Sequence, residues 1–374
     1  MINNARLLKL IRKLVSIDSQ NPPGDESAIA SFVAGYLQRL GLRVRTYEFA
    51  KNRVNVVSVL KGSGRRSLLI TPHLDTVPAG RSWTVPPFKG VVKAGRLYGL
   101  GATDCKSNLA CAMEALNSIV EDGVRPGYDL IFAATADEES GSELGLIPLL
   151  EKRVLKPDAA LVLDADDFDI ITTQKGLIHI KVKIKGRKAH GAYPWRGVNA
   201  IDTAVSLIKG IKSHKFRYKK NKYLRPPTVN VGTIKGGDKV NVVADWCELE
   251  LDLRFLPGTK GRDLLRQVKN IIRRYAPHST VETEGIQEPY SIRDDHPLVC
   301  GLRDSARRFK VDSRIKGSEG ATVITFFQHK GIPAVATGYG SGSCAHMADE
   351  YVKPRDLYKG ALVLEDFLKS YRFR

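Results

Sequence analysis

Apolar residues recur every three or four positions at the start of the chain, which is the spacing of one face of a helix. One apolar stripe runs from Leu7 to Val15, and a second runs from Ile29 to Leu40 with Asp25 as its expected N-cap. Short apolar runs, each closed by polar residues, follow at residues 54–60, 67–70, 130–134, 159–163 and 332–336. Because helical stretches at 108–120 and 321–327 lie between several of these runs, the pattern predicts an α/β domain with a mostly parallel sheet flanked by helices.

The middle of the chain follows a different pattern. Residues 177–185 and 248–255 alternate apolar and polar side chains, as half-exposed antiparallel strands do. Helical stretches at 200–211 and 261–275 accompany them, which gives the order β-α-β-β-α-β. We therefore predict a small α+β unit at residues 174–287, inserted into a larger domain formed by residues 1–173 and 288–374.

The composition is that of a soluble globular protein, with 43% apolar and 26% charged residues in a chain of 374. This balance excludes wholesale disorder and a disulfide scaffold. The five cysteines are odd in number and lack CxxC spacing, so a cysteine-based zinc module is not indicated and a reducing cytoplasm fits best. No secretion signal and no apolar run of the ~20 residues that cross a bilayer is present, so we expect a cytoplasmic protein without a membrane partner.

The formal net charge of +19 is concentrated in one part of the chain. Residues 175–225 contain fifteen Lys or Arg and one acid, Asp202, whereas residues 137–169 contain ten acids and three bases. A change of sign this abrupt indicates two units with different roles. The basic segment favours an anionic small molecule, an acidic protein or a nucleic acid as partner, while a solvated face is the plainer explanation for most of its lysines.

Several predicted strands end in side chains that bind metals. The run ending at Ile70 leads to His73 and Asp75, and the next runs lead to Asp137-Glu138-Glu139 and to Asp164-Ala165-Asp166. The last run leads through a glycine-rich loop to His346. Because ligands of open α/β sheets bind outside the carboxyl ends of the strands, we expect these groups to converge.

Imidazole and carboxylate donors suit Zn(II), Mn(II) or Co(II), and the carboxylates are numerous enough to bridge two ions. In the pair Glu138-Glu139, one carboxylate can bind metal while the other carries a proton. Asp75 shares a strand face with His73 and can orient its imidazole.

Other common sites are absent from the sequence. Gly99-Leu100-Gly101-Ala102-Thr103-Asp104 has two glycines before a helix, but the third glycine of a dinucleotide-binding loop is replaced by Asp104 and no full βαβ context surrounds it. The P-loop lysine and the HExxH helix are missing.

Eight segments in a fixed order carry a resemblance to a known family. They are Pro72–Pro78, Trp83–Phe88, Leu97–Lys106, Asp137–Glu139, Ala189–Pro194, Gly197–Ile201, Asp252–Arg254 and Ala345–Glu350. On these segments the chain resembles, nearly end to end, the co-catalytic zinc family of acetylornithine deacetylase, succinyl-diaminopimelate desuccinylase, aminoacylase and glutamate carboxypeptidase. The resemblance implies that the inserted α+β unit, which is ferredoxin-like, serves as a lid and dimerisation domain.

The resemblance also implies roles for individual residues. Asp104 would bridge two divalent ions, most simply zinc, with His73 and Asp164 at one ion and Glu139 and His346 at the other. Glu138 would be the general base, Asp75 would orient His73, and His190 would stabilise the oxyanion, in its own active site or in that of a second subunit. Asn241 and Arg254 would bind the substrate carboxylate, although a structural salt bridge is the alternative for Arg254.

Three positions depart from the family pattern. Leu100 stands where Arg is usual, Cys105 stands where Met or Ala is common, and Asp164-Ala165 stands where deacetylases often have Glu-Pro. Asp166 therefore stays an alternative to Asp164 as the ligand, and the identity of the substrate stays open.

The function expected from this resemblance is metal-dependent hydrolysis of an amide next to a free carboxylate, with an N-acyl amino acid as the first candidate substrate. A carboxypeptidase or dipeptidase is the alternative within the family. A non-catalytic basic protein that binds nucleic acid or an acidic protein is the alternative outside it, although no nucleic acid partner is expected of the enzyme. The basic insertion could also steer an anionic substrate or an acidic carrier protein that bears the amide.

Overall fold

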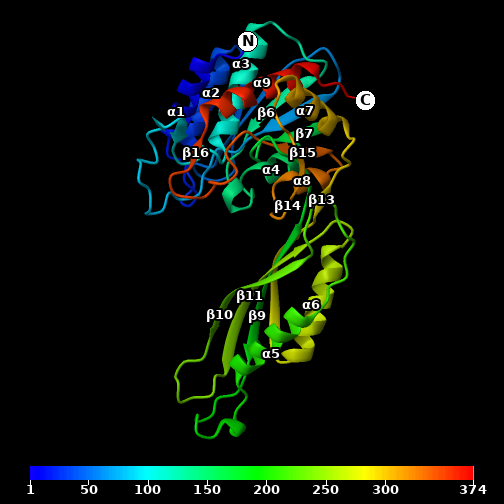
Figure 1. Ribbon diagram of the computed structural model, residues 1–374. Coiled ribbons are helices and arrows are strands. Elements are labelled where there is room, and N and C mark those ends of the chain that lie inside the picture. The colour runs from blue at the N-terminus through cyan, green and yellow to red at the C-terminus, as the bar shows by residue number, and fades with distance from the viewer. Residues whose placement is uncertain (374) are drawn as a thin grey trace. The chain divides into compact units, whose positions relative to one another are not determined.

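The computed structural model describes residues 1–373 and divides into two compact units (Figure 1). The first unit comprises Met1–Thr172, Ile292–Lys316 and the chain from Phe326 onward. The second unit comprises Thr173–Ser291 and Gly317–Thr325. The sequence pattern placed an insertion at residues 174–287, inside the second unit, but did not single out Gly317–Thr325.

The first unit is built on a central sheet whose four middle strands are parallel. These strands are, in spatial order, β6 (Asp129–Ala134), β3 (Ser67–Thr71), β7 (Ala159–Val162) and β15 (Ala334–Thr337). The strands beside them are antiparallel: β2 (Val54–Leu60) and β1 (Arg43–Glu48) beyond β6, and β8 (Ile170–Gln174) beyond β15. Two short strands, β13 (Tyr290–Ser291) and β14 (Ile315–Ser318), pair with β8. The predicted α/β class with a largely parallel sheet is confirmed.

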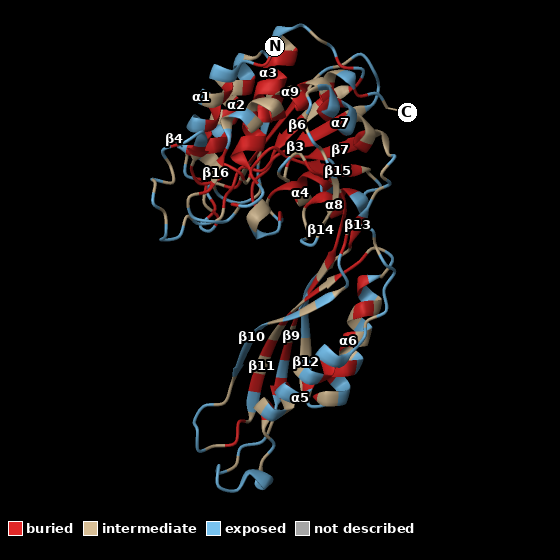
Figure 2. Ribbon diagram, viewed as in Figure 1, coloured by how far each residue is buried: buried red, intermediate tan, exposed pale blue. Residues whose placement is uncertain are grey.

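Helices cover the central sheet. They are α1 (Asn4–Val15), α2 (Ser27–Arg39), α3 (Lys106–Glu121), α4 (Leu146–Glu151), α7 (Pro297–Arg308), α8 (Ile324–Gln328) and α9 (Pro354–Ser370). Helix α3 packs against both α1 and α9, and its residues from Lys106 to Ile119 are all buried, as the red ribbon in Figure 2 shows. Such a helix is enclosed on all sides, so its amino end has a fixed position in the core.

Two helix starts differ from the predictions. Helix α2 begins at Ser27, and its N-cap is Glu26 rather than Asp25. The carboxylate of Asp25 accepts hydrogen bonds from the backbone N–H of Ser27 at 3.0 Å, from the Ser27 hydroxyl and from the side chain of Asn52. The helix predicted at 321–327 begins only at Ile324. The residues before it are held in a loop because Thr322 donates to the side-chain oxygen of Gln174 from both its backbone N–H and its hydroxyl.

A separate small sheet joins the C-terminal part of the first unit to the segment before α3. Its strands are β16 (Tyr351–Val352), β5 (Arg96–Tyr98) and β4 (Val91–Lys93), all antiparallel. This pairing brings the glycine-rich loop after β15 back toward the start of α3.

The second unit is a four-stranded antiparallel sheet with two helices on one face (Figure 1). Strands β9 (Gly176–Lys185), β10 (Thr228–Gly236), β11 (Trp246–Phe255) and β12 (Ser279–Gln287) lie in the order β10-β11-β9-β12, and the helices are α5 (Ala200–Ser213) and α6 (Gly261–Tyr275). Apolar residues of β9 and β11 alternate with polar ones and pack under the helices in a core of their own. This arrangement is ferredoxin-like, as predicted.

No helix within residues 1–373 combines the length and the apolar character needed to cross a membrane.

The loop after β15 depends on a close approach that only glycine permits. A Cβ atom on Gly338 would lie 1.6 Å from the carbonyl oxygen of Ala165, which is backbone and cannot move aside as a side chain could. We expect Gly338→Ala to lower the free energy of unfolding by about 1–3 kcal/mol, measured by urea denaturation. Gly35→Ala is the control, because this helical glycine has space and should gain up to ~1 kcal/mol. Equal stabilities of the two variants would contradict this account.

Candidate active site

Side chains from four strand ends and from the start of α3 meet at the carboxyl edge of the central sheet. His73 follows β3, Glu138 and Glu139 follow β6, Asp164 follows β7, and His346 lies in the loop after β15. Asp104 comes from the loop before α3. The convergence expected from the sequence is present. The contacts below link the side chains of all these residues except Glu138, which is near enough to Asp164 for the two charges to interact.

Asp104 lies between two imidazoles. Its Oδ1 is 2.9 Å from Nε2 of His73, and its Oδ2 is 3.1 Å from Nε2 of His346. Although burial alone would raise it, the hydrogen bonds from these two imidazoles hold the pKa of Asp104 well below its usual range. Each oxygen therefore faces a different nitrogen donor, which is the arrangement that a carboxylate bridging two ions requires.

The two halves of this cluster are completed by further carboxylates. Oε2 of Glu139 is 3.2 Å from Nε2 of His346, and Oδ1 of Asp164 is 3.9 Å from Nε2 of His73. Burial raises the pKa of Asp164 to about 7, and Asp104 adds to the effect. The hydrogen bonds with Asp104 and Glu139 raise the pKa of His346 to about 10.

Asp166 has different surroundings. Its carboxylate packs against the glycine-rich loop, where a Cβ atom on Gly340 would lie 2.6 Å from its Oδ1. Between the two candidates that the sequence left open, Asp164 is the residue whose carboxylate approaches His73.

Asp75 contacts the site mainly through main-chain groups, both its own carbonyl and the N–H groups of Glu138 and Glu139. Nδ1 of His73 lies 3.0 Å from the carbonyl oxygen of Asp75 and 3.5 Å from its carboxylate. The carboxylate itself accepts hydrogen bonds from the backbone N–H groups of Glu138 and Glu139, both at 3.1 Å, and from the side chain of Asn21 at 2.9 Å. Asp75 therefore ties the turn that carries Glu138 to the segment that carries His73.

The turn after β6 rests on a buried ion pair network. Asp137 has a left-handed backbone (φ 66°) and pairs with Arg53 at 2.8 Å, and Arg53 also pairs with the fully buried Glu26 at 2.8 Å. Above this network Glu138 opens a single 3₁₀ turn, Glu138–Ser140. Burial and the neighbouring Asp164 raise the pKa of Glu138 well above its usual value.

The cluster fits a pair of divalent ions. Donor atoms of Asp104, Glu139 and His346 all lie within 4.8 Å of one another, and those of His73, Asp104 and Cys105 do so as well. Glu139 Oε1 is buried and has no hydrogen-bond partner within residues 1–373. A buried carboxylate oxygen is costly without a partner, and a cation bound by this set would supply one. The donors are imidazole and carboxylate, as zinc, cobalt and manganese accept.

Two residues near the cluster were not assigned a role from the sequence. Cys105 is buried, and its Sγ contacts the backbone of His73, accepting from the N–H at 3.2 Å. Glu350 is buried, and it binds the loop that carries Asp104. Cys105 lies in the segment Leu97–Lys106 and Glu350 in the segment Ala345–Glu350, both of which carry the family resemblance. Their place in these segments was the only feature of the sequence that could have pointed to them.

The second unit brings His190 and Asn241 together. The N–H of Gly191 donates to the carbonyl of Asn241 at 2.8 Å, and His190 forms a β-bridge with Val242. Nδ1 of His190 accepts a hydrogen bond from the N–H of Ala192 at 3.1 Å. In the neutral ring this acceptor role puts the proton on Nε2, which is therefore free to act as a donor.

Arg254 lies at the other end of the same sheet. Its Nε and Nη2 bind the two carboxylate oxygens of Asp252 at 2.7 and 2.9 Å, so the salt bridge considered from the sequence exists. This pairing uses the Nε–Nη2 edge of the guanidinium. The Nη1 group stays available to bind a second carboxylate.

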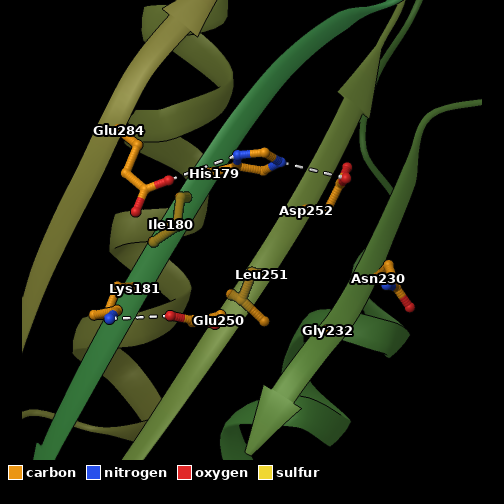
Figure 3. A pocket seen from close by; sticks show the side chains of 9 residues that line it. All are labelled: His179, Ile180, Lys181, Asn230, Gly232, Glu250, Leu251, Asp252 and Glu284. Atoms are coloured by element: carbon orange, nitrogen blue, oxygen red, sulfur yellow. Dashed lines mark ion pairs between the residues drawn. The ribbon is translucent and has the colours of Figure 1, made fainter. Parts of the chain in front are cut away.

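A depression of about 330 Å³ on the sheet of the second unit is lined by His179, Asp252 and Glu284 among others. Figure 3 shows these side chains on their strands. Nε2 of His179 lies 3.5 Å from Asp252, and its Nδ1 lies 3.7 Å from Glu284. Asp252 is thus shared between Arg254 and His179, which fixes the direction of the guanidinium.

Known proteins are similar to this chain in sequence and in fold. The model of peptidase family M20/M25/M40 matches residues 69–370. Acetylornithine deacetylase from Proteus mirabilis is 31% identical over 370 residues, covering 92% of this chain and 91% of that protein. A tripeptidase from Staphylococcus aureus has the same fold with a TM-score of 0.82 at 27% identity, covering 99% of this chain and 98% of that one.

An aminopeptidase from Bacillus cereus superposes with a TM-score of 0.83 at 22% identity, covering 98% of both chains, and supports the fold alone. The family match spans most of the chain and includes His73, Asp104, Glu138, Glu139 and His346. The chain therefore belongs to peptidase family M20/M25/M40 and is a metal-dependent amidohydrolase.

Proposed function

We propose that the protein hydrolyses the amide bond of an N-acyl amino acid that carries a free carboxylate. The similarity to acetylornithine deacetylase over nine-tenths of the chain carries this proposal, together with the cluster around Asp104. Cleavage of a short peptide is the second candidate, favoured by the similarity to the Staphylococcus aureus tripeptidase.

The proposed metal ligands are the residues of the cluster. His73 and Asp164 would hold one ion, Glu139 and His346 the other, and Asp104 would contact both. Two divalent ions bound there, zinc in our proposal, would supply Lewis-acid activation of a water and of the amide carbonyl.

Glu138 is the proposed general base. Its carboxylate takes a proton from the attacking water and returns it to the nitrogen of the leaving amine. Asp75 supports this role because it holds the backbone N–H groups of Glu138 and Glu139. The turn therefore keeps its position while the carboxylate gains and loses a proton.

The second unit is proposed to bind the rest of the substrate. Arg254 would bind the substrate carboxylate with the free edge of its guanidinium, and Asn241 would add a hydrogen bond. His190 would donate from Nε2 to the oxygen that develops negative charge, an interaction that typically supplies ~3 kcal/mol.

Geometry within the second unit supports a homodimer in which His190 serves the other subunit. Arg254 pairs with Leu177 at one end of β9 and β11, and His190 lies beyond the Lys185–Trp246 pair at the other end. The eight residue steps from Trp246 to Arg254 span about 27 Å of strand. A small N-acyl amino acid cannot reach both ends, so one of these contacts would come from a second copy of the chain.

The basic character of the second unit fits an anionic substrate, including an acidic carrier protein that bears the amide. Lys215, Arg217 and Lys219 are exposed and form no ion pair with a carboxylate of the described chain. Cations without partners attract anions over a distance of about 10 Å at moderate salt.

Replacing Glu138 tests the general base. We expect Glu138→Gln to lower kcat by at least ~100-fold while two ions per chain remain bound, because the amide keeps the shape but cannot carry the proton. Activity is followed by amine release, and metal content by mass spectrometry. Glu143→Gln, an exposed glutamate of the same turn region, should behave as wild type. Full activity of Glu138→Gln would remove Glu138 from this role.

A substrate panel tests the proposed substrate class. The wild type should cleave N-acetyl and N-succinyl amino acids with a free carboxylate at least ~10-fold better, by kcat/KM, than the same compounds with the carboxylate amidated. Arg254→Lys should raise KM by ~10-fold or more for the free acids and leave the amides unaffected. Arg266→Lys, which also disturbs an Arg–Asp pair, is the control. Preference for di- or tripeptides would instead support the second candidate.

Mixed dimers test the placement of His190. Glu138→Ala and His190→Ala should each be inactive alone. When the two variants are unfolded and refolded together in equal amounts, about a quarter of wild-type activity should return, since half of the dimers then hold one complete site. If His190 serves its own subunit, no activity returns, and a monomer in sedimentation would equally reject the shared site.

A further inference from the structure

The loop that carries Asp104 directs three backbone N–H groups at a single carboxylate. Glu350 accepts from the N–H of Gly101 at 2.8 Å, of Thr103 at 2.7 Å and of Asp104 itself at 2.9 Å. The two carboxylate oxygens share these donors, with Thr103 and Asp104 on one and Gly101 on the other. The main chain at Asp104 is therefore fixed by a residue about 250 positions later in the sequence.

Glu350 is only 1% exposed, and no described lysine or arginine forms an ion pair with it. Its carboxylate oxygens are instead paired with backbone N–H groups. Three hydrogen bonds of 2.7 to 2.9 Å from one short loop hold that loop in place. The side chain is thus placed to fix a backbone.

The same segment also carries His346. On the backbone, the N–H of Gly99 donates to the carbonyl of Glu350 at 2.9 Å, and Tyr351 pairs with Tyr98. The hydroxyl of Thr103 donates to the carbonyl of Tyr351 at 2.7 Å. The segment from His346 to Tyr351 and the loop before α3 therefore form one hydrogen-bonded assembly. Both residues of the Asp104–His346 contact belong to it.

We propose that Glu350 is a positioning residue of the metal centre: it holds the main chain of Asp104 so that both carboxylate oxygens face their imidazoles, and it couples this position to the loop of His346. The proposal rests on the assignment of Asp104 as a metal ligand made above. Glu350 itself is not part of either group of candidate metal ligands among the described residues.

An uncharged replacement should not fulfil this role. In Glu350→Gln, the amide group would place its own N–H donors against at least one of the three backbone donors. In Glu350→Asp the charge stays, but the carboxylate is withdrawn by one methylene and cannot meet all three donors. Metal affinity should therefore fall in the order wild type, Glu350→Asp, Glu350→Gln.

The experiment measures zinc affinity of the full-length apoprotein by competition with a chromophoric chelator, together with the number of ions bound and the thermal midpoint of the apoprotein. Glu350→Gln should weaken zinc binding ~10–100-fold and lower kcat, with little change in KM. Glu114→Gln is the matched control, since Glu114 is equally buried and bound to Arg6 and to the backbone of Asn3. It should lower the thermal midpoint without changing zinc affinity.

Asp104→Asn separates the two proposals. If Asp104→Asn binds zinc as wild type does, the ligand assignment fails and the role of Glu350 fails with it. If Asp104→Asn loses zinc while Glu350→Gln retains wild-type affinity, only the role of Glu350 is overturned. Should Glu350→Gln not fold, the same comparison is made with Glu350→Asp, whose zinc affinity must then fall below that of wild type.

Discussion

Crowding of carboxylates at one edge of the central sheet is the constraint on which the rest of the structure depends. Asp104, Glu138, Glu139 and Asp164 lie together where β3, β6 and β7 end, and burial makes each charge costly. The imidazoles of His73 and His346 offset part of this cost by pairing with Asp104 and Glu139. Two divalent ions would remove most of the remaining repulsion, so metal binding and stability are coupled at this edge.

The surroundings of the cluster follow from the same constraint. Asp75 and Glu350 are buried carboxylates that bind backbone N–H groups, and Arg53 balances Glu26 and Asp137 behind the turn of Glu138. Each of these groups fixes a loop rather than touching the reaction. The geometry of the cluster is therefore set by hydrogen bonds from outside it, and this preorganisation lets short loops hold the candidate ligands accurately.

Much of this could be predicted from the sequence, because strand ends and ligand types are local signals. The positions of β2 and α6 agree with the pattern of residues alone, and the candidate ligands follow β3 and β6 as that pattern predicts. The start of α8 could not be predicted, since a contact between Thr322 and Gln174 decides it. The choice between Asp164 and Asp166 depends likewise on the packing of Gly340, and no local pattern encodes such distant contacts.

The strand order of the central sheet has a consequence for how the chain is made. β7 and β8 follow one another closely in the sequence, yet β15 lies between them in the sheet. Until residues 334–337 leave the ribosome, the parallel half of the sheet ends at β7 with an open, apolar edge. The whole second unit is synthesised during that interval and, with a core of its own, can fold while the first waits. Nearly complete synthesis is thus needed before the first unit closes, and a chain that ends early exposes a surface that chaperones and proteases recognise.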